Sequence, residues 1–282
     1  MADGARNILA VVVTYRPEAA PVGLLETLAG QADAVVVVDN GSPNLADIEA
    51  AAHQAGARLI ANPANLGVAA ALNQAARLAR DEGFAWLAMF DQDSSVPPGA
   101  LAGLLDLRAS HPRPNRIAIL ALGHRDRATG HGYFRAGDIL EETPAWRSLR
   151  TTITSGSLVR VAAFHEVGFF DEKLFIDGVD HDFCLRCRAA GWLVIQSRGE
   201  FMDHALGAIS QRRVLGRTVP LSNHPPDRRY YIARNTLELI VRHVGHDPVW
   251  AARAAIHLAV DSAAAALLER DRAAKLAAML QG

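Results

Sequence analysis

The sequence predicts an α/β fold in which a mostly parallel central sheet is flanked by helices and followed by a C-terminal helical segment. Two observations predict the sheet: the first third of the chain alternates short β-branched runs with helical patterns, and each β-branched run ends in polar turn residues. A third predicts the helical segment, because the chain from Asp247 onwards is rich in alanine and helical in pattern.

The first four strands are expected at residues 8–14, 35–38, 58–61 and 86–90, which are short apolar runs. Residues 68–82, between the last two runs, are rich in Ala and Leu and predict a helix that stops at Gly83. The fourth strand therefore delivers Asp91 at its carboxyl end.

Beyond Leu122 the pattern is less regular. The loops of residues 123–136 and the loose stretch to Arg150 are typical of variable structure that faces a substrate. Further strands are expected at 151–159, 192–196 and 201–204, and helices at 161–167 and 179–190.

Composition excludes several classes of protein. With 282 residues, half of them apolar, the chain can bury one large core, or one core with a helical appendix. A net charge of -1 does not provide the positive field that holds nucleic acid. Residues 1–7 lack the pattern of a secretory signal, so we expect a cytoplasmic protein. The only cysteines, Cys184 and Cys187, lie inside a predicted helix, which favours a structural role over zinc or redox chemistry.

Polar residues follow the first, second and fourth predicted strands. In open α/β sheets the ligand lies outside the carboxyl ends of the strands, so we expect Thr14, Asp39 and Asp91 to converge there. The dinucleotide-binding glycine motif and the P-loop are both absent from the sequence. A phosphate ligand at this edge would therefore need a metal ion.

Asp91 and Asp93 can face one hard cation, Mg²⁺ or Mn²⁺, because they stand two residues apart in a turn. The competing explanation is that Asp91 caps its strand and Asp93 N-caps the helix after Pro97 and Pro98. Asp39 is a candidate for hydrogen bonds to a base or ribose, or else simply begins a turn. Tyr15 is placed to pack on the base.

Chemistry at such a site would also need a general base, and the helix of residues 179–190 offers Asp180 and Asp182, with Asp177 as a third choice. Acids in a first turn are also favoured by the helix dipole alone. His204 is either a ligand that completes the metal shell or a structural histidine. Arg212, Arg213 and Arg217 begin a basic stretch that is either a solvated face or a cationic lid over phosphates; Arg228, Arg229 and Arg234 continue it.

Six motifs in this order resemble the family 2 inverting glycosyltransferases, in particular the bacterial rhamnosyltransferase branch that builds O-antigen polysaccharides. They occupy residues 12–15, 37–42, 65–73, 90–94, 175–186 and 204–207. The resemblance implies a GT-A fold with a Rossmann-like sheet, in which Asp39 contacts the nucleoside, Asp91 and Asp93 hold the metal, and Asp180 is the base. It also implies that Asp182 is a second acid and that His204 contacts metal or diphosphate. Further donor contacts are expected at Thr14, Tyr15, Asn65, Gly67, Asn73, Asp91, Arg212 and Arg213.

The donor that the resemblance implies is dTDP-L-rhamnose, and the acceptor is a hydroxyl of a saccharide or a polyprenyl-linked saccharide. Another nucleotide sugar, UDP- or GDP-linked, as in galactofuranose transfer, is the alternative donor. A nucleotidyltransferase would instead show a glycine-rich basic loop after the first strand, where this chain has residues 14–17. A protein that only binds nucleotide sugars would lack the base or the metal acids, which are all present.

The chain is expected to divide by role into a nucleotide-sugar-binding half (1–122), an acceptor-binding and catalytic half (123–220) and a C-terminal helical segment (221–282). Residues 249–268 are the most apolar stretch, but Arg253, His257 and Asp261 interrupt it, so we do not expect a membrane-spanning helix. The helical segment is expected to pack on the catalytic domain; the alternatives are a homodimer contact and the cytoplasmic membrane surface.

Overall fold

The computed structural model describes residues 7–126, 132–133, 136–204, 210–214, 217–221 and 223–282. The chain forms two compact units. The first consists of residues 1–172 and 180–205, and the second of residues 173–179 and 206–282. The chain therefore enters the second unit for a few residues before it returns to the first at Asp180.

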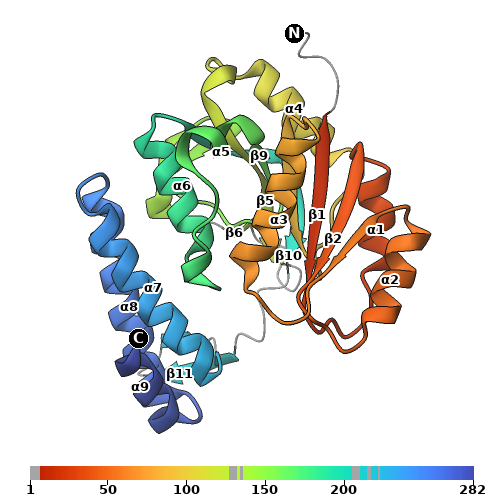
Figure 1. Ribbon diagram of the computed structural model, residues 1–282. Helices are drawn as coiled ribbons and strands as arrows, with labels where there is room; N and C mark the ends of the chain where they lie inside the picture. The colour runs from red at the N-terminus through yellow and green to blue at the C-terminus, as the bar shows by residue number, and fades with distance from the viewer. Residues whose placement is uncertain (1–6, 127–131, 134–135, 205–209, 215–216, 222) are drawn as a thin grey trace. The chain divides into compact units, whose positions relative to one another are not determined.

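The first unit is built on a mixed sheet to which ten described strands contribute (Figure 1). The strand order is β3-β2-β1-β4-β9-β5-β10-β8-β7, and β6 pairs with β5. Along this path only β9 and β8 run against the others, so the prediction of a mostly parallel sheet is confirmed. The strands are β1 (Ile8–Thr14), β2 (Ala34–Asp39), β3 (Arg58–Ala61), β4 (Trp86–Asp91), β5 (Ile117–Asp126), β6 (Gly132–Tyr133), β7 (Ile139–Glu142), β8 (Trp146–Leu149), β9 (Ser157–Arg160) and β10 (Leu193–His204).

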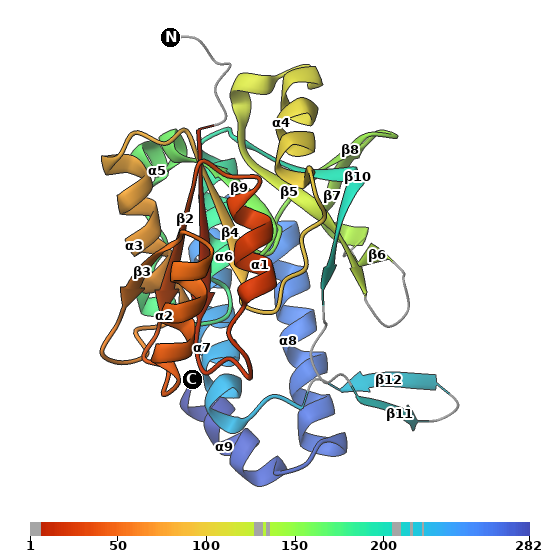
Figure 2. The same cartoon turned by 90° about the vertical axis from the view of Figure 1, so that its right-hand side faces the viewer.

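Helices cover both faces of this sheet (Figure 2). They are α1 (Val22–Ala29), α2 (Leu45–Gln54), α3 (Val68–Asp81), α4 (Ala100–Ser110), α5 (Val161–Val167) and α6 (Val179–Ala189). Alternate side chains of a strand point to opposite faces, and Ile8, Ala10 and Val12 of β1 share one core with residues of α1, α2 and α4. Helix α3 crosses the other face, where it contacts β1, β2 and β4.

The predicted elements of the first third are confirmed to within one or two residues. Later elements differ. The predicted strand at 151–159 is a loop as far as residue 156, and only β9 is a strand, because Gly156 has a left-handed φ of 76° and turns the chain. The two strands predicted at 192–196 and 201–204 are one strand, β10, with a register shift between Gln196 and Phe201. The region predicted as loops after Leu122 begins with the end of β5.

The second unit contains a hairpin, β11 (Ser210–Val214) with β12 (Arg217–Leu221), and three helices, α7 (Pro226–His243), α8 (Pro248–Leu268) and α9 (Arg272–Gln281). A buried ion cluster joins the helices. Arg229 is 1% exposed and pairs with Asp261 at 2.5 Å and with Glu269 at 2.7 Å, while Lys275 contacts Glu269 at 2.8 Å. The predicted C-terminal helical segment is therefore present, with an interior of its own.

Candidate active site

The carboxyl ends of β2, β1 and β4 form a common edge of the sheet. Thr14 pairs with Asp39 across β1 and β2, and Val13 pairs with Asp91 across β1 and β4. Neighbouring strands lie about 4.8 Å apart. The convergence that the sequence predicts for Thr14, Asp39 and Asp91 is therefore present in the structure.

Asp39 is fully buried, and both oxygens of its carboxylate accept hydrogen bonds, from the end of β1 and from the turn that follows β2. Oδ1 accepts from the hydroxyls of Thr14 at 2.8 Å and Ser42 at 2.6 Å, and Oδ2 accepts from the backbone N–H groups of Ser42 at 2.8 Å and Gly41 at 3.0 Å. In this arrangement Thr14 and Asp39 order the turn that follows β2. Sequence reasoning did not single out Ser42, although Ser and Asp are common turn partners.

The turn after β4 presents Asp91 half-buried and Asp93 exposed. Helix α4 begins after Gly99 with no side-chain cap, so the competing explanation that Asp93 caps this helix is wrong. Gln92, between the two acids, accepts the N–H of Tyr15 at 2.9 Å and donates to its carbonyl at 3.4 Å. Gln92 thus joins the acidic turn to the end of β1, a positioning role that the sequence pattern did not reveal.

The loop of residues 151–156 supports the acidic turn from the other side. The hydroxyl of Ser155 accepts the N–H of Asp91 at 3.1 Å and lies 2.7 Å from the hydroxyl of Ser94. The carbonyl of Thr152, in the same loop, accepts the thiol of Cys184 of α6 at 3.7 Å. One buried loop therefore connects the acidic turn to the helix that carries Asp180. The sequence signal for this loop is its run of Thr, Ser and Gly, a run that falls within the strand predicted at 151–159.

Asn65 and Gly67 form a tight turn rather than an open surface. The Asn65 side chain accepts the N–H of Gly67 at 2.9 Å, and Asn40 donates to the Gly67 carbonyl at 3.1 Å. A Cβ on Gly41 would lie 2.9 Å from the backbone of Ala64, so the two loops touch. Their expected contacts with the donor stay a prediction.

Asn73 is 1% exposed, and the loop after α5 occupies its amide. Its nitrogen donates to the carbonyl of Phe170 at 2.9 Å and to the carboxylate of Glu172 at 2.8 Å, while its oxygen accepts the N–H of Phe170 at 2.9 Å. The hydrogen bond from Asn73 to the Glu172 carboxylate lowers the pKa of Glu172 from its usual value. These contacts assign Asn73 a structural role and leave no hydrogen of its amide for a donor.

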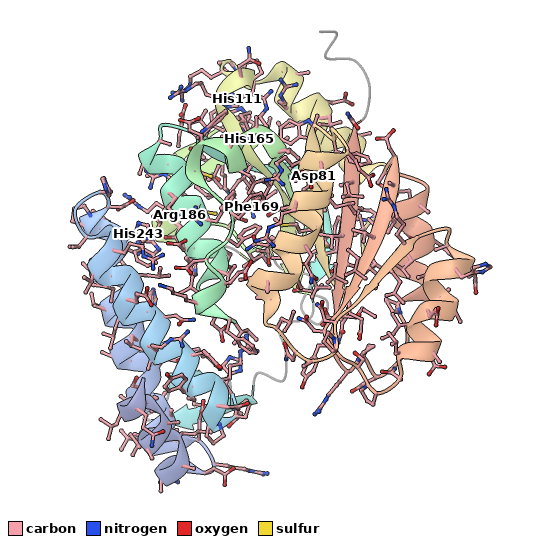
Figure 3. The ribbon with its side chains drawn as sticks, viewed as in Figure 1. Asp81, His111, His165, Phe169, Arg186 and His243 are labelled. Atoms are coloured by element: carbon pink, nitrogen blue, oxygen red, sulfur yellow. The ribbon has the colours of Figure 1, made fainter. Side chains whose placement is uncertain are left out.

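The two acids of α6 have different surroundings. Asp180 is half-buried and accepts the N–H of His181 at 2.8 Å, as an acid in a first turn does. Asp182 is fully buried and pairs with Arg186 at 2.8 Å. Arg186 in turn holds the loop after α5 by donating to the carbonyls of Val167 at 2.5 Å and Phe169 at 2.9 Å (Figure 3). Burial and this ion pair indicate that Asp182 positions Arg186, and its role as a second acid stays a prediction.

Asp177, the third choice for the base, belongs to the second unit and accepts two hydrogen bonds from Arg228, both at 2.9 Å. Cys184 and Cys187 are buried among the core residues of α6. Burial raises the pKa of the Cys187 thiol to about 12 and that of Cys184 well above its usual value. These are the properties of inert core thiols.

Three predicted ligands lie at positions whose side chains are outside the described residues. The backbone of His204 ends β10, and those of Arg212 and Arg213 lie in β11. Among the residues that the structure describes, no group of three or more His, Cys, Asp and Glu side chains is arranged to hold a metal ion. The acidic turn by itself supplies two carboxylates, which are hard oxygen ligands suited to Mg²⁺ or Mn²⁺.

Residues 10–168 match the family described as Glycosyl transferase family 2. The chain is 35% identical to "dTDP-rhamnosyl transferase RfbF" of Shigella flexneri over 251 residues, which cover 83% of this chain and 80% of that protein. It is 30% identical to "N-acetylglucosaminyl-diphospho-decaprenol L-rhamnosyltransferase" of Mycobacterium tuberculosis, over 66% of this chain and 71% of that protein. The chain belongs to glycosyl transferase family 2, and it is a glycosyltransferase.

Solved structures of low sequence identity share the fold. S. aureus TarS in complex with UDP-GlcNAc superposes with a TM-score of 0.60 at 14% identity, over 96% of this chain and 79% of that chain. GalNAc-T7 with UDP, GalNAc and Mn²⁺ gives a TM-score of 0.53 at 12% identity, and this chain spans 48% of that one. The fold is of the GT-A type, as expected from the sequence.

Proposed function

We propose that this glycosyltransferase moves L-rhamnose from dTDP-L-rhamnose to a hydroxyl of a saccharide or lipid-linked saccharide, with inversion at the anomeric carbon, in the synthesis of a cell-surface polysaccharide. The names of the two relatives at 35% and 30% identity support the sugar. The observation that carries the activity is the acidic turn at the common edge of β1, β2 and β4, where Asp93 is exposed and caps no helix.

In this proposal Asp91 and Asp93 hold a divalent cation, with His204 as a further ligand. The donor set fits, since the turn offers carboxylate oxygens at the ligand edge of an α/β sheet. Bound there, the cation would neutralise charge on the leaving diphosphate. Arg212 and Arg213 would contact the diphosphate oxygens, and Tyr15 the base.

Asp180 takes the proton of the acceptor hydroxyl in the proposed reaction. The hydroxyl oxygen then bonds to the anomeric carbon while the bond from that carbon to the diphosphate oxygen breaks, and dTDP leaves with the electron pair. Residues 1–122 would carry the donor and residues 123–220 the acceptor, as the sequence predicts.

The assignment of the base is tested with Asp180→Asn. This variant should keep the donor affinity of the wild type and lose about 10²-fold or more in turnover, because a general base contributes roughly 10²–10⁴-fold. Calorimetry measures donor affinity, and a product assay with dTDP-L-rhamnose measures turnover. Turnover within a few-fold of wild type would show that another residue is the base.

The assignment of the metal is tested with Asp93→Ala. Donor binding to the wild type should require Mg²⁺ or Mn²⁺ and should weaken on chelation, whereas the variant should bind weakly with or without metal. Asp106→Ala, on α4, is a control outside the acidic turn. Metal-dependent binding that survives in Asp93→Ala would refute the assignment.

We also propose that α8 lies on the cytoplasmic face of the cell membrane. By length and composition it is the helix among the described residues that could cross a membrane, which is weak evidence by itself. Its outer face is unpacked: Val249 is 50% exposed, Ile256 62%, Val260 63% and Leu267 67%. Packing on the catalytic domain, the first choice from sequence, stays a prediction.

Charge favours a lipid surface over a second copy of the chain. Of the acids on and beside α8, Asp247 caps Trp250, Asp261 pairs with Arg229 and Glu269 is buried, while Asp271 is exposed. Arg270 and Arg272, which follow the helix, are exposed and suit anionic headgroups. The ion pair of Asp261 with buried Arg229 ties α8 to α7, so α8 lies along the surface in this proposal rather than across the membrane.

Sedimentation with vesicles tests this proposal. The protein should sediment with phosphatidylglycerol vesicles, and Ile256→Ser with Val260→Ser should abolish this, whereas Leu140→Ser, a change of an exposed leucine in β7, should not. If instead the wild type does not bind vesicles but is a dimer in light scattering, and the double variant is a monomer, this face is a homodimer interface.

A further inference from the structure

The segment just before Asp180 has an unusual backbone. Phe175 and Asp177 have φ angles of 61° and 63°, and Gly178 has a φ of 83°. Bulky residues rarely adopt this left-handed conformation, and it persists only where surrounding contacts hold it. The segment of residues 173–179, which we call the base-approach segment, therefore needs a support.

Asn235 of α7 supplies the first part of this support. It is 1% exposed, and its side-chain nitrogen lies 2.8 Å from the carbonyl oxygen of Leu174, 2.8 Å from that of Ile176 and 2.7 Å from that of Asp177. The two hydrogens of this buried amide are thus shared among three carbonyls of the irregular backbone, and the carbonyl of Leu174 also accepts the N–H of Ile176 at 2.6 Å.

Arg228, two helical turns earlier on α7, supplies the second part. Its guanidinium donates to both oxygens of Asp177 at 2.9 Å, a paired geometry that fixes direction as well as distance. The rings of Phe175 and Tyr231 stack with centroids 5.0 Å apart. A Cβ on Gly178 would lie 3.0 Å from Leu239, so the segment fits closely against α7.

We propose that Arg228 and Asn235 are positioning residues for catalysis: by holding the base-approach segment, they set where the carboxylate of Asp180 emerges at the start of α6. The inference rests on the proposed role of Asp180 as the base. The coupling runs along the chain, because Gly178 and Val179 belong to the segment and Asp180 is the next residue. In this proposal α7 serves the reaction through the base-approach segment.

Arg228→Ala tests the proposal, with Arg242→Ala as the matched control. Arg242 is on the same helix, is exposed, and pairs with Glu238 rather than with the base-approach segment. We expect kcat to fall about 10-fold or more in Arg228→Ala, since small misplacements of reacting groups are costly. Donor Kd should stay within about 2-fold, and Arg242→Ala should match wild type in both quantities.

A second variant separates positioning from folding. Asn235→Asp keeps the size of the side chain and removes its donors, so kcat should fall as in Arg228→Ala at a temperature where circular dichroism shows the wild-type helix content.

Wild-type kcat in folded Arg228→Ala and folded Asn235→Asp would overturn the inference. That failure is distinguishable from failure of the proposed function. If Asp180→Asn is inactive while both α7 variants are fully active, the assignment of Asp180 as the base is supported and the positioning role of α7 is refuted. If Asp180→Asn is active, the base assignment itself falls, and with it the inference that rests on it.

Discussion

Asn73 illustrates how a polar residue in a family motif can serve structure. Its amide holds the N–H and carbonyl of Phe170 and the carboxylate of Glu172. Asn73 belongs to one of the six motifs, and a contact with the donor was expected there. The loop that binds the Asn73 amide comes from nearly a hundred residues further along the chain, and no local sequence pattern predicts such a partner.

We predict that Asn73→Ala lowers the free energy of unfolding by about 1–3 kcal/mol, because it leaves buried groups of the loop unpaired. Donor affinity of the folded protein should be unchanged. Urea denaturation measures the first quantity and calorimetry the second. Arg77→Ala, which removes an exposed pair with Glu172, should cost no more than about 1 kcal/mol. If the Asn73→Ala protein is as stable as wild type but binds the donor more weakly, Asn73 contacts the donor after all.

At the scale of elements, α6 has one face buried in the core and carries a candidate catalytic residue at its start. Its cysteines, Cys184 and Cys187, are packed inside, while Asp180 stands at the helix start. Sequence reasoning predicted this helix and the structural role of its cysteines. It could not predict that the loop of residues 151–156 would tie the helix to the acidic turn, since that loop enters β9, which runs antiparallel between β4 and β5.

The raised thiol pKa values give α6 a pH signature. Burial raises the pKa of the Cys187 thiol to about 12 from an ordinary value of 9.0. The stabilisation that comes from keeping this thiol protonated in the folded protein is therefore fully present below about pH 9. It is lost as the pH rises from there toward 12, because the unfolded chain releases the proton first. The free energy of unfolding should therefore fall over this range, and less so in Cys187→Ala.

Alkylation provides an independent measurement of the same burial. At pH 8 iodoacetamide should leave both thiols of the native protein unmodified and should modify both in urea, as mass spectrometry would show. Modification of the native protein at the rate of the unfolded chain would place the thiols at an accessible site.

At the scale of the whole molecule, the chain has near-neutral net charge, so donor recognition depends on local groups rather than on a global field. The second unit contributes the base-approach segment and α7, although its sequence has none of the proposed catalytic acids. Sequence order alone divided the chain into successive parts. The structure instead makes residues 173–179 part of the later unit.

We predict that dTDP-L-rhamnose with Mg²⁺ or Mn²⁺ raises the melting temperature by several degrees. A ligand at 100 times its Kd stabilises the folded state by about 2.7 kcal/mol. UDP- and GDP-sugars should give smaller shifts, and chelation should remove the shift. A larger shift with a UDP-sugar would replace the proposed donor and leave the family assignment intact.

The sequence by itself determined the order of the strands and helices in the first third and the acidic turn after β4, because hydrophobic periodicity and turn chemistry are local properties of the chain. The six motifs in their order indicated the family by resemblance. Only the tertiary structure decided which acids are exposed, that Gln92 and Ser155 hold the acidic turn, and that α7 holds the segment before Asp180. Those contacts join residues far apart in sequence, and their free energy depends on burial and geometry that arise only when the chain is folded.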